Sequence, residues 1–128
     1  MTGHADGYVR IIDNNTILVN EIKENEYKYW MDGFIKMVKQ HQLNCIEVPW
    51  FEYKVKDKPD SAIGLYLNYL EIEDLIILPV FEVKGNMDQK IIDLFESLFP
   101  YKYIEPVNIN PVGQEGGLMN CISWNIRI

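Results

Sequence analysis

Two short motifs near opposite ends of this 128-residue chain carry the side chains best suited to covalent chemistry. Near the start, Gly3-His4-Ala5-Asp6 offers an imidazole for proton transfer and a carboxylate two residues further on. Near the end, Gly116-Gly117 precedes Cys121, and glycines let the backbone approach a ligand closely. A cysteine thiolate is a nucleophile that a neighbouring acid–base group can assist. The two motifs together predict nucleophilic catalysis at a cysteine.

Each motif also has a plainer structural interpretation. His4 and Asp6 can belong to a solvated terminal segment. Cys121 can be an inert packed thiol, with Gly116 and Gly117 serving only a turn. The chain has two cysteines and no Cys-x-x-Cys pair, so we expect no disulfide framework and no cysteine site for zinc or redox chemistry. We also expect no metal and no cofactor, because attack by a thiolate needs neither.

The bulk composition is that of a globular protein, with 48% hydrophobic and 24% charged residues. The net charge of −7 argues against a nucleic-acid-binding surface, which needs clustered Lys and Arg. Acidic charge can draw a cationic ligand toward a cleft, although it also serves solubility alone. The sequence shows no signal peptide and no apolar run of membrane-spanning length, so we expect a cytosolic protein without a membrane partner.

The chain reads as two similar strand-rich segments. Residues 8–12 and 16–19 predict a hairpin that turns at Asp13-Asn14-Asn15, and apolar residues at steps of three and four predict a helix over 25–42. A strand follows at 45–48, with Cys45 expected to be buried. On this helix, Trp30, Met31, Met37 and His41 fit core and rim positions better than a ligand-binding stripe.

The same order returns in the second half of the chain. Strands are predicted at 65–70 and 75–81, then a helix that begins at Asn86 and ends before Pro100, then a strand at 103–107. Ile46-Glu47 and Ile104-Glu105 occupy equivalent places, which gives a period of 104 − 46 = 58 residues. The sequence therefore predicts an α/β protein that contains a ββαβ unit twice.

We expect one domain over residues 1–128, with unit one at about 7–49 and unit two at about 62–107. Residues 50–60 are charged and contain proline, which indicates a surface loop, either a solvated connector or a lid. There Trp50-Phe51 and Tyr53 either cap the core or stack on a ligand. Residues 108–117 predict a loop, and 119–128 predict a last strand.

Several motifs, in order along nearly the whole chain, resemble the agmatine deiminases and bacterial-type peptidylarginine deiminases. They are Thr2-Gly3-His4-Ala5-Asp6-Gly7-Tyr8-Val9-Arg10, Leu65-Tyr66-Leu67-Asn68-Tyr69-Leu70, Leu78-Pro79-Val80-Phe81, Leu98-Phe99-Pro100 and Glu115-Gly116-Gly117-Leu118-Met119-Asn120-Cys121. The resemblance implies a pentein fold, a propeller of five ββαβ units. With two units and a final strand, this chain resembles the C-terminal half of such a protein, a half-propeller. Asn120 stands where many relatives have His.

The resemblance also implies roles for individual residues. Cys121 would attack the guanidinium carbon, His4 would protonate the departing ammonia and then activate water, and Asp6 would bind the guanidinium. Gly116 and Gly117 would line the substrate-binding loop. Two further acidic residues belong to the half of the family fold that this chain does not match. Arg10 either pairs with Asp6 or is a cross-strand surface charge.

Two functions from different classes follow from this resemblance. The first is a deiminase-like amidinohydrolase that acts on agmatine, arginine or peptidyl-arginine, and activity on agmatine would belong to putrescine biosynthesis. This function needs either acidic residues from a second subunit or a looser mechanism. The second is a non-catalytic binding or assembly module derived from a truncated deiminase. Half a propeller exposes strand edges and unit faces, so either reading predicts a homo-oligomer.

Overall fold

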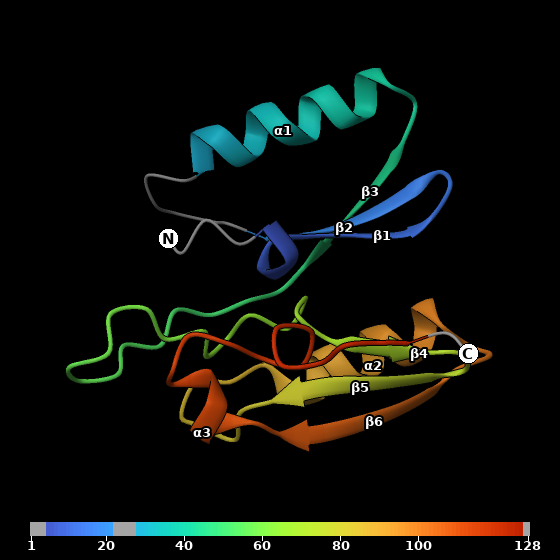
Figure 1. The fold of residues 1–128 in the computed structure, drawn as a ribbon. Helices are drawn as coiled ribbons and strands as arrows, with labels where there is room; N and C mark the ends of the chain where they lie inside the picture. The colour runs from blue at the N-terminus through green and yellow to red at the C-terminus, as the bar shows by residue number, and fades with distance from the viewer. Residues whose placement is uncertain (1–4, 22–27, 127–128) are drawn as a thin grey trace.

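The computed structural model describes residues 5–21 and 28–126 and contains two three-stranded sheets with helices packed beside them (Figure 1). Unit one contains a short 3₁₀-helix η1 (Ala5–Gly7), β1 (Val9–Asp13), β2 (Thr16–Asn20), α1 (Lys28–Gln40) and β3 (Asn44–Val48). Unit two contains β4 (Leu70–Ile72), β5 (Leu75–Val80), α2 (Asp88–Leu98), β6 (Tyr103–Asn108) and α3 (Asn110–Gly113). The mixed α+β composition agrees with the predicted fold class.

The two sheets have the same topology. In each sheet the middle strand pairs antiparallel with the preceding strand and parallel with the strand after the helix, in the orders β1-β2-β3 and β4-β5-β6. Leu18 pairs with Ile46, and Ile76 pairs with Ile104, so corresponding residues of the two pairs lie 58 positions apart in the sequence, as predicted (76 − 18 and 104 − 46). A parallel pair needs a crossover, which α1 and α2 supply.

Strand β2 is buried on both faces and joins the two units. Ile17 and Val19 pack with Met31 and Val38 of α1 in a small apolar cluster. Leu18 points to the opposite face and joins the larger core, which is centred on unit two. That core contains the aromatic side chains of Tyr66, Tyr69, Phe81, Phe95 and Phe99 and the aliphatic side chains of Leu67, Ile76, Leu78, Ile91 and Leu118.

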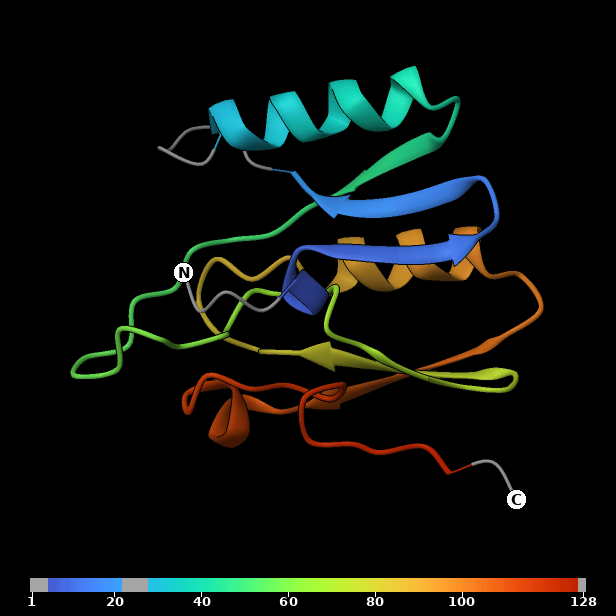
Figure 2. The ribbon, with the colours of Figure 1, turned by 45° about the horizontal axis from the view of Figure 1, so that its top comes forward.

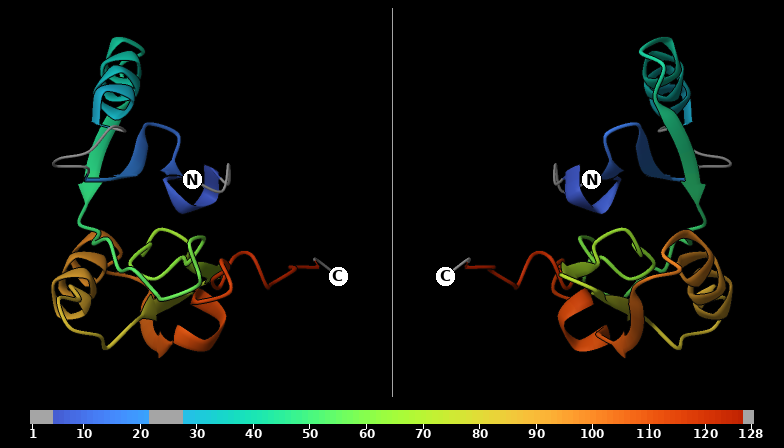
Figure 3. Two further views of the ribbon diagram at one scale, coloured as in Figure 1. Left: turned by 90° about the vertical axis from the view of Figure 1, so that its left-hand side faces the viewer. Right: turned by 90° about the vertical axis from the view of Figure 1, so that its right-hand side faces the viewer.

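Helices α1 and α2 lie on one side of the molecule, whereas η1 and the C-terminal segment lie on the other (Figure 3). The segment at 60–70 lies between the two units and brings residues of unit two under η1 (Figure 2). No helix within residues 5–21 and 28–126 is long and apolar enough to cross a membrane.

In the second half of the chain, two strand predictions are wrong. The segment 65–69 forms turns, and only Leu70–Ile72 joins a sheet, because the N–H groups of Leu65 and Asn68 bond the carbonyls of Ala62 and Leu65, three residues earlier in the chain, and not a neighbouring strand. The predicted last strand at 119–128 is also wrong over its described part, 119–126. A turn closes from Leu118 O to Ile122 N, and Trp124 is 86% exposed with no described strand beside it.

Three smaller predictions differ from the structure, two on helices and one on strand β3. The predicted loop at 108–117 contains α3, whose Pro111 stands in the first turn, where a missing N–H costs least. On α1, Met31 is buried as predicted, whereas Trp30 and Met37 are exposed, and Trp30 stacks on Phe34 at 5.6 Å between ring centroids. Cys45 is only half-buried, on β3. The predicted helix start at 25–27 lies outside the described residues.

Candidate functional site

Asp6 lies on η1, and two hydrogen bonds hold that short helix in place, one within its own turn and one from the end of β2. The N–H of Tyr8 donates to the carbonyl of Ala5 at 2.9 Å, which closes the turn. Asn20, at the end of β2 and 1% exposed, donates its side-chain amide to the carbonyl of Gly7 at 2.8 Å. A buried amide that bonds backbone fixes local geometry, because an unpaired buried polar group is costly. Asp6 is therefore held on the face of unit one that meets unit two.

Cys121 lies on the loop formed by residues 115–121, which we call the nucleophile loop after the role predicted for Cys121. Leu118 and Met119 are buried in the main core and anchor the loop, whereas Cys121 itself is exposed. Gly116 has φ +88, a conformation that suits glycine. A Cβ placed on Gly116 would lie 3.0 Å from the carbonyl oxygen of Asp60. The loop conformation therefore requires a residue without a side chain at position 116.

Asn68 connects Asp6 with Cys121. The side chain of Asn68 is 3% exposed. Its amide nitrogen donates to Asp6 Oδ2 at 2.8 Å and to Cys121 Sγ at 3.2 Å. Its amide oxygen accepts the backbone N–H groups of Asn120 at 3.0 Å and of Cys121 at 3.3 Å. One buried side chain thus holds the carboxylate, the sulfur and the backbone of the nucleophile loop together.

The carboxylate and the thiol are in direct contact. Cys121 Sγ lies 3.5 Å from Asp6 Oδ2, across a separation of 115 residues, and the thiol donates to the carboxylate. Asn120 Nδ2 donates to the same oxygen at 2.9 Å. Burial opposes ionisation of Asp6, but hydrogen bonds from Asn120, Cys121 and Asn68 together hold the pKa of this carboxyl below its ordinary value of 3.8. Asp6 is therefore an anion at neutral pH.

Arg10 reaches the same cluster from β1. Its guanidinium donates to Asn120 Oδ1 at 3.2 Å and lies 4.4 Å from the centroid of the Tyr69 ring, a cation–π contact. Arg10 therefore neither pairs directly with Asp6 nor serves as a free surface charge. It restrains Asn120, the neighbour of Cys121 in the chain.

The predicted site residues fall into three groups. Asp6 and Cys121 come together, Gly116 and Gly117 lie on the loop beside them, and His4 lies outside the described residues. Sequence reasoning placed no site role on Asn68 or Asn120. Asn68 could have been recognised from its place in an otherwise apolar run of the sequence. A polar amide that is buried there needs hydrogen-bond partners, which indicates a structural role.

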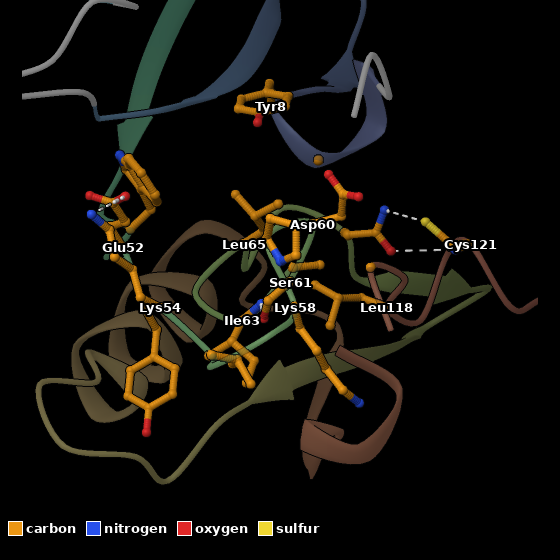
Figure 4. Close-up of a pocket in the computed structure, with 18 of the residues that line it drawn as sticks. Tyr8, Glu52, Lys54, Lys58, Asp60, Ser61, Ile63, Leu65, Leu118 and Cys121 are labelled. Atoms are coloured by element: carbon orange, nitrogen blue, oxygen red, sulfur yellow. Dashed lines mark hydrogen bonds and ion pairs between the residues drawn. The ribbon is translucent and has the colours of Figure 1, made fainter. Parts of the chain in front are cut away.

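A pocket of about 580 Å³ opens next to Cys121. Figure 4 shows Tyr8 above it, the side chains of the 50–61 loop around it, and Cys121 at its edge with two contacts to Asn68. Leu65 and Leu118 supply apolar wall. Within the described part of the chain, no group of three or more His, Cys, Asp or Glu side chains is arranged to hold a metal ion.

Replacing Gly116 by Ala is expected to lower the free energy of unfolding by about 1–3 kcal/mol, because the new Cβ is strained at positive φ and meets Asp60. Gly117→Ala is the matched control, since its Cβ would make only an ordinary 3.5 Å contact with the Cβ of Cys121. Urea denaturation compares the two variants. Equal stability of both would contradict the close approach at Gly116.

Comparisons with known proteins agree with the sequence motifs. A family model described as Porphyromonas-type peptidyl-arginine deiminase matches residues 1–126. Agmatine deiminase of Campylobacter jejuni has a similar structure, with a TM-score of 0.76 and 22% identity over 92% of this chain and 37% of the other. Agmatine deiminase of Enterococcus faecalis gives 0.74 and 20% over 94% and 39%. The chain thus spans less than half of either enzyme. Among curated protein sequences, none matches.

Proposed function

Because this chain belongs to the Porphyromonas-type peptidyl-arginine deiminase family, we propose that it is a deiminase-like domain that hydrolyses a guanidinium group through Cys121. The observation that carries this proposal is the contact of Asp6 with Cys121 across 115 residues, organised by the buried amide of Asn68. A carboxylate and a thiol in contact at the edge of a pocket suit a cationic substrate with an electrophilic carbon. The ligand class is a small guanidine: agmatine, arginine or peptidyl-arginine.

The chemistry follows from these groups. Asp6 binds the N–H edge of the guanidinium, and the bound cation favours the thiolate of Cys121 beside it. The sulfur attacks the central carbon, and ammonia leaves with a proton from His4, which gives a covalent thiouronium. Water, deprotonated by His4, then attacks the same carbon, the C–S bond breaks, and a ureido product and the thiolate remain. His4 takes its role from the family resemblance.

Ammonia release from agmatine, free arginine and an arginine peptide tests the proposal. We expect turnover of at least one of them, and its loss in Cys121→Ala and in His4→Ala. Circular dichroism and thermal unfolding verify that each protein is folded. A folded wild-type chain that releases no ammonia from any of the three contradicts the enzyme function, as does turnover that survives Cys121→Ala.

The proposal extends to architecture and assembly. The two ββαβ units form part of a pentein-type propeller, which their identical topology and their helices on one side support. Exposed apolar side chains follow the outer strands and the C-terminal segment: Ile72, Tyr103, Val107, Ile122, Trp124 and Ile126. Such surfaces favour association, so we propose a homo-oligomer. The cytosolic location expected from the sequence is kept as part of the proposal.

The same exposed side chains favour a second function, a non-catalytic assembly module. In that case we expect light scattering to find a stable oligomer and the assay to detect no ammonia release from any of the three guanidine substrates. A monomeric chain that turns over a guanidine substrate excludes it.

A further inference from the structure

The pocket beside Cys121 contains a carboxylate that the family resemblance does not assign. Asp60 lies at the end of the 50–61 loop, and Figure 4 shows its side chain in the pocket together with that of Cys121. Its backbone adjoins the nucleophile loop, since a Cβ on Gly116 would lie 3.0 Å from Asp60 O and 3.8 Å from Asp60 Cβ. The close contact between the backbones of Asp60 and Gly116 therefore fixes the position of Asp60 next to the nucleophile loop.

The lysines around this pocket already have acidic partners. Lys58 forms an ion pair with Glu115, and Lys54 lies 3.8 Å from Glu52. Asp60 has no ion pair and accepts no hydrogen bond from the rest of the described chain. Its two oxygens are thus open to a cationic ligand.

Asp6 reaches the guanidinium only from the edge of the pocket, beside Cys121, and leaves the interior of the pocket without its carboxylate. Its Oδ2 already accepts from Asn68, Asn120 and Cys121, and Asp6 does not line the pocket. A guanidinium is planar and presents pairs of parallel N–H groups, which a carboxylate with two open oxygens binds bidentately. The aromatic rings of Tyr8, Trp50 and Tyr53, which also line the pocket, add faces that attract a cation.

We propose that Asp60 is a specificity-determining residue that binds the positive charge of the ligand within the pocket and so selects cations over neutral analogues of the same shape. This inference rests on the proposed guanidine-directed function. It assigns to the chain's own 50–61 loop a second carboxylate for the ligand, in addition to Asp6.

Binding measurements separate this inference from catalysis. Isothermal titration calorimetry on Cys121→Ala protein, which cannot turn over, is run with butylguanidine and with its neutral analogue butylurea. Asp60→Asn is expected to raise the Kd for butylguanidine about 10- to 100-fold, the loss of a charge-assisted hydrogen bond, and to leave butylurea nearly unchanged. Asp60→Glu keeps the charge and is expected to stay within a few-fold of the parent.

Asp74→Asn is the matched control, because it removes the same charge from an exposed turn between β4 and β5. We expect no change in either Kd. An equal loss of butylguanidine affinity in Asp74→Asn and Asp60→Asn, an unchanged Kd in Asp60→Asn, or the absence of butylguanidine binding to folded protein would each overturn the role of Asp60.

Ammonia release by the wild type tests the proposed function separately. Turnover by the wild type together with an unchanged Kd in Asp60→Asn refutes only the role of Asp60. Butylguanidine binding that depends on Asp60, without turnover by the wild type, refutes only the catalysis.

Discussion

Replacement of Asn68 by Leu is expected to lower the free energy of unfolding by about 2–4 kcal/mol and to reduce turnover at least about 100-fold. Leucine has a similar size, so the change leaves polar partners unpaired rather than opening a cavity. Asp6 Oδ2 loses one of its donors, the backbone N–H of Cys121 loses its acceptor, and the N–H of Asn120 keeps only its 3.3 Å bond to the main-chain carbonyl of residue 68. The loop is then free to move Cys121 away from Asp6. Urea denaturation and the ammonia assay measure the two effects.

Tyr66→Phe is the matched control for Asn68. Tyr66 lies two residues earlier in the same buried segment, and its hydroxyl donates to Asp88 at 2.6 Å and accepts the N–H of Met87 at 2.9 Å. These partners belong to the start of α2 and not to the thiol. Tyr66→Phe should therefore cost about 1–2 kcal/mol of stability and leave turnover near the wild-type rate, once both are measured well below the unfolding transition. Equal turnover in the two variants would refute Asn68 as a positioning residue.

Replacement of Asp6 by Asn is expected to weaken guanidine binding and turnover by about 10- to 100-fold. The amide oxygen of the new side chain can still accept from Asn68 and Asn120, so the variant removes mainly the negative charge. Butylurea, which is neutral, should bind both proteins alike. A variant that binds butylguanidine as tightly as the parent would show that Asp6 does not face the cation.

The same variant has a defined pH signature. Hydrogen bonds from Asn120, Cys121 and Asn68 outweigh burial and lower the pKa of Asp6 in the folded state. A carboxyl whose pKa is lower in the folded than in the unfolded state stabilises the fold above the unfolded pKa, and this contribution is lost as the pH falls through the folded value. The stability difference between wild type and Asp6→Asn should therefore be constant above about pH 5 and shrink below about pH 4. A difference that instead grows on acidification would contradict the lowered pKa.

Local signals in the sequence predicted most of the regular elements. The hairpin at 8–19 turns where Asp13-Asn14-Asn15 interrupts two β-branched runs, and the structure has β1 and β2 on either side of that turn. The parallel partners Leu18–Ile46 and Ile76–Ile104 reproduce the 58-residue period. These features follow from short-range propensity and from the apolar composition of the buried strands.

The failures occur where the chain has no strand to pair with. Residues 65–69 carry strand-forming side chains, but the N–H groups of Leu65 and Asn68 bond carbonyls three residues earlier, so the segment forms turns in the core instead of a strand. Residues 119–126 have strand-like composition, but the described chain provides no neighbouring edge to pair with them. Propensity describes one residue and its neighbours, whereas a strand exists only if a second segment of chain accepts its hydrogen bonds.

The sequence by itself determined the two ββαβ units, the chemical types of the candidate site residues and the resemblance to guanidine-modifying enzymes. Only the tertiary structure decided that Asp6 contacts Cys121, that Asn68 holds both, and that Asp60 lies in the same pocket. The physical reason is distance along the chain. Periodicity reports which side chains leave water, but a hydrogen bond between residues 6 and 121 depends on how two sheets pack through Leu18 and the core of unit two, and no local pattern encodes that packing.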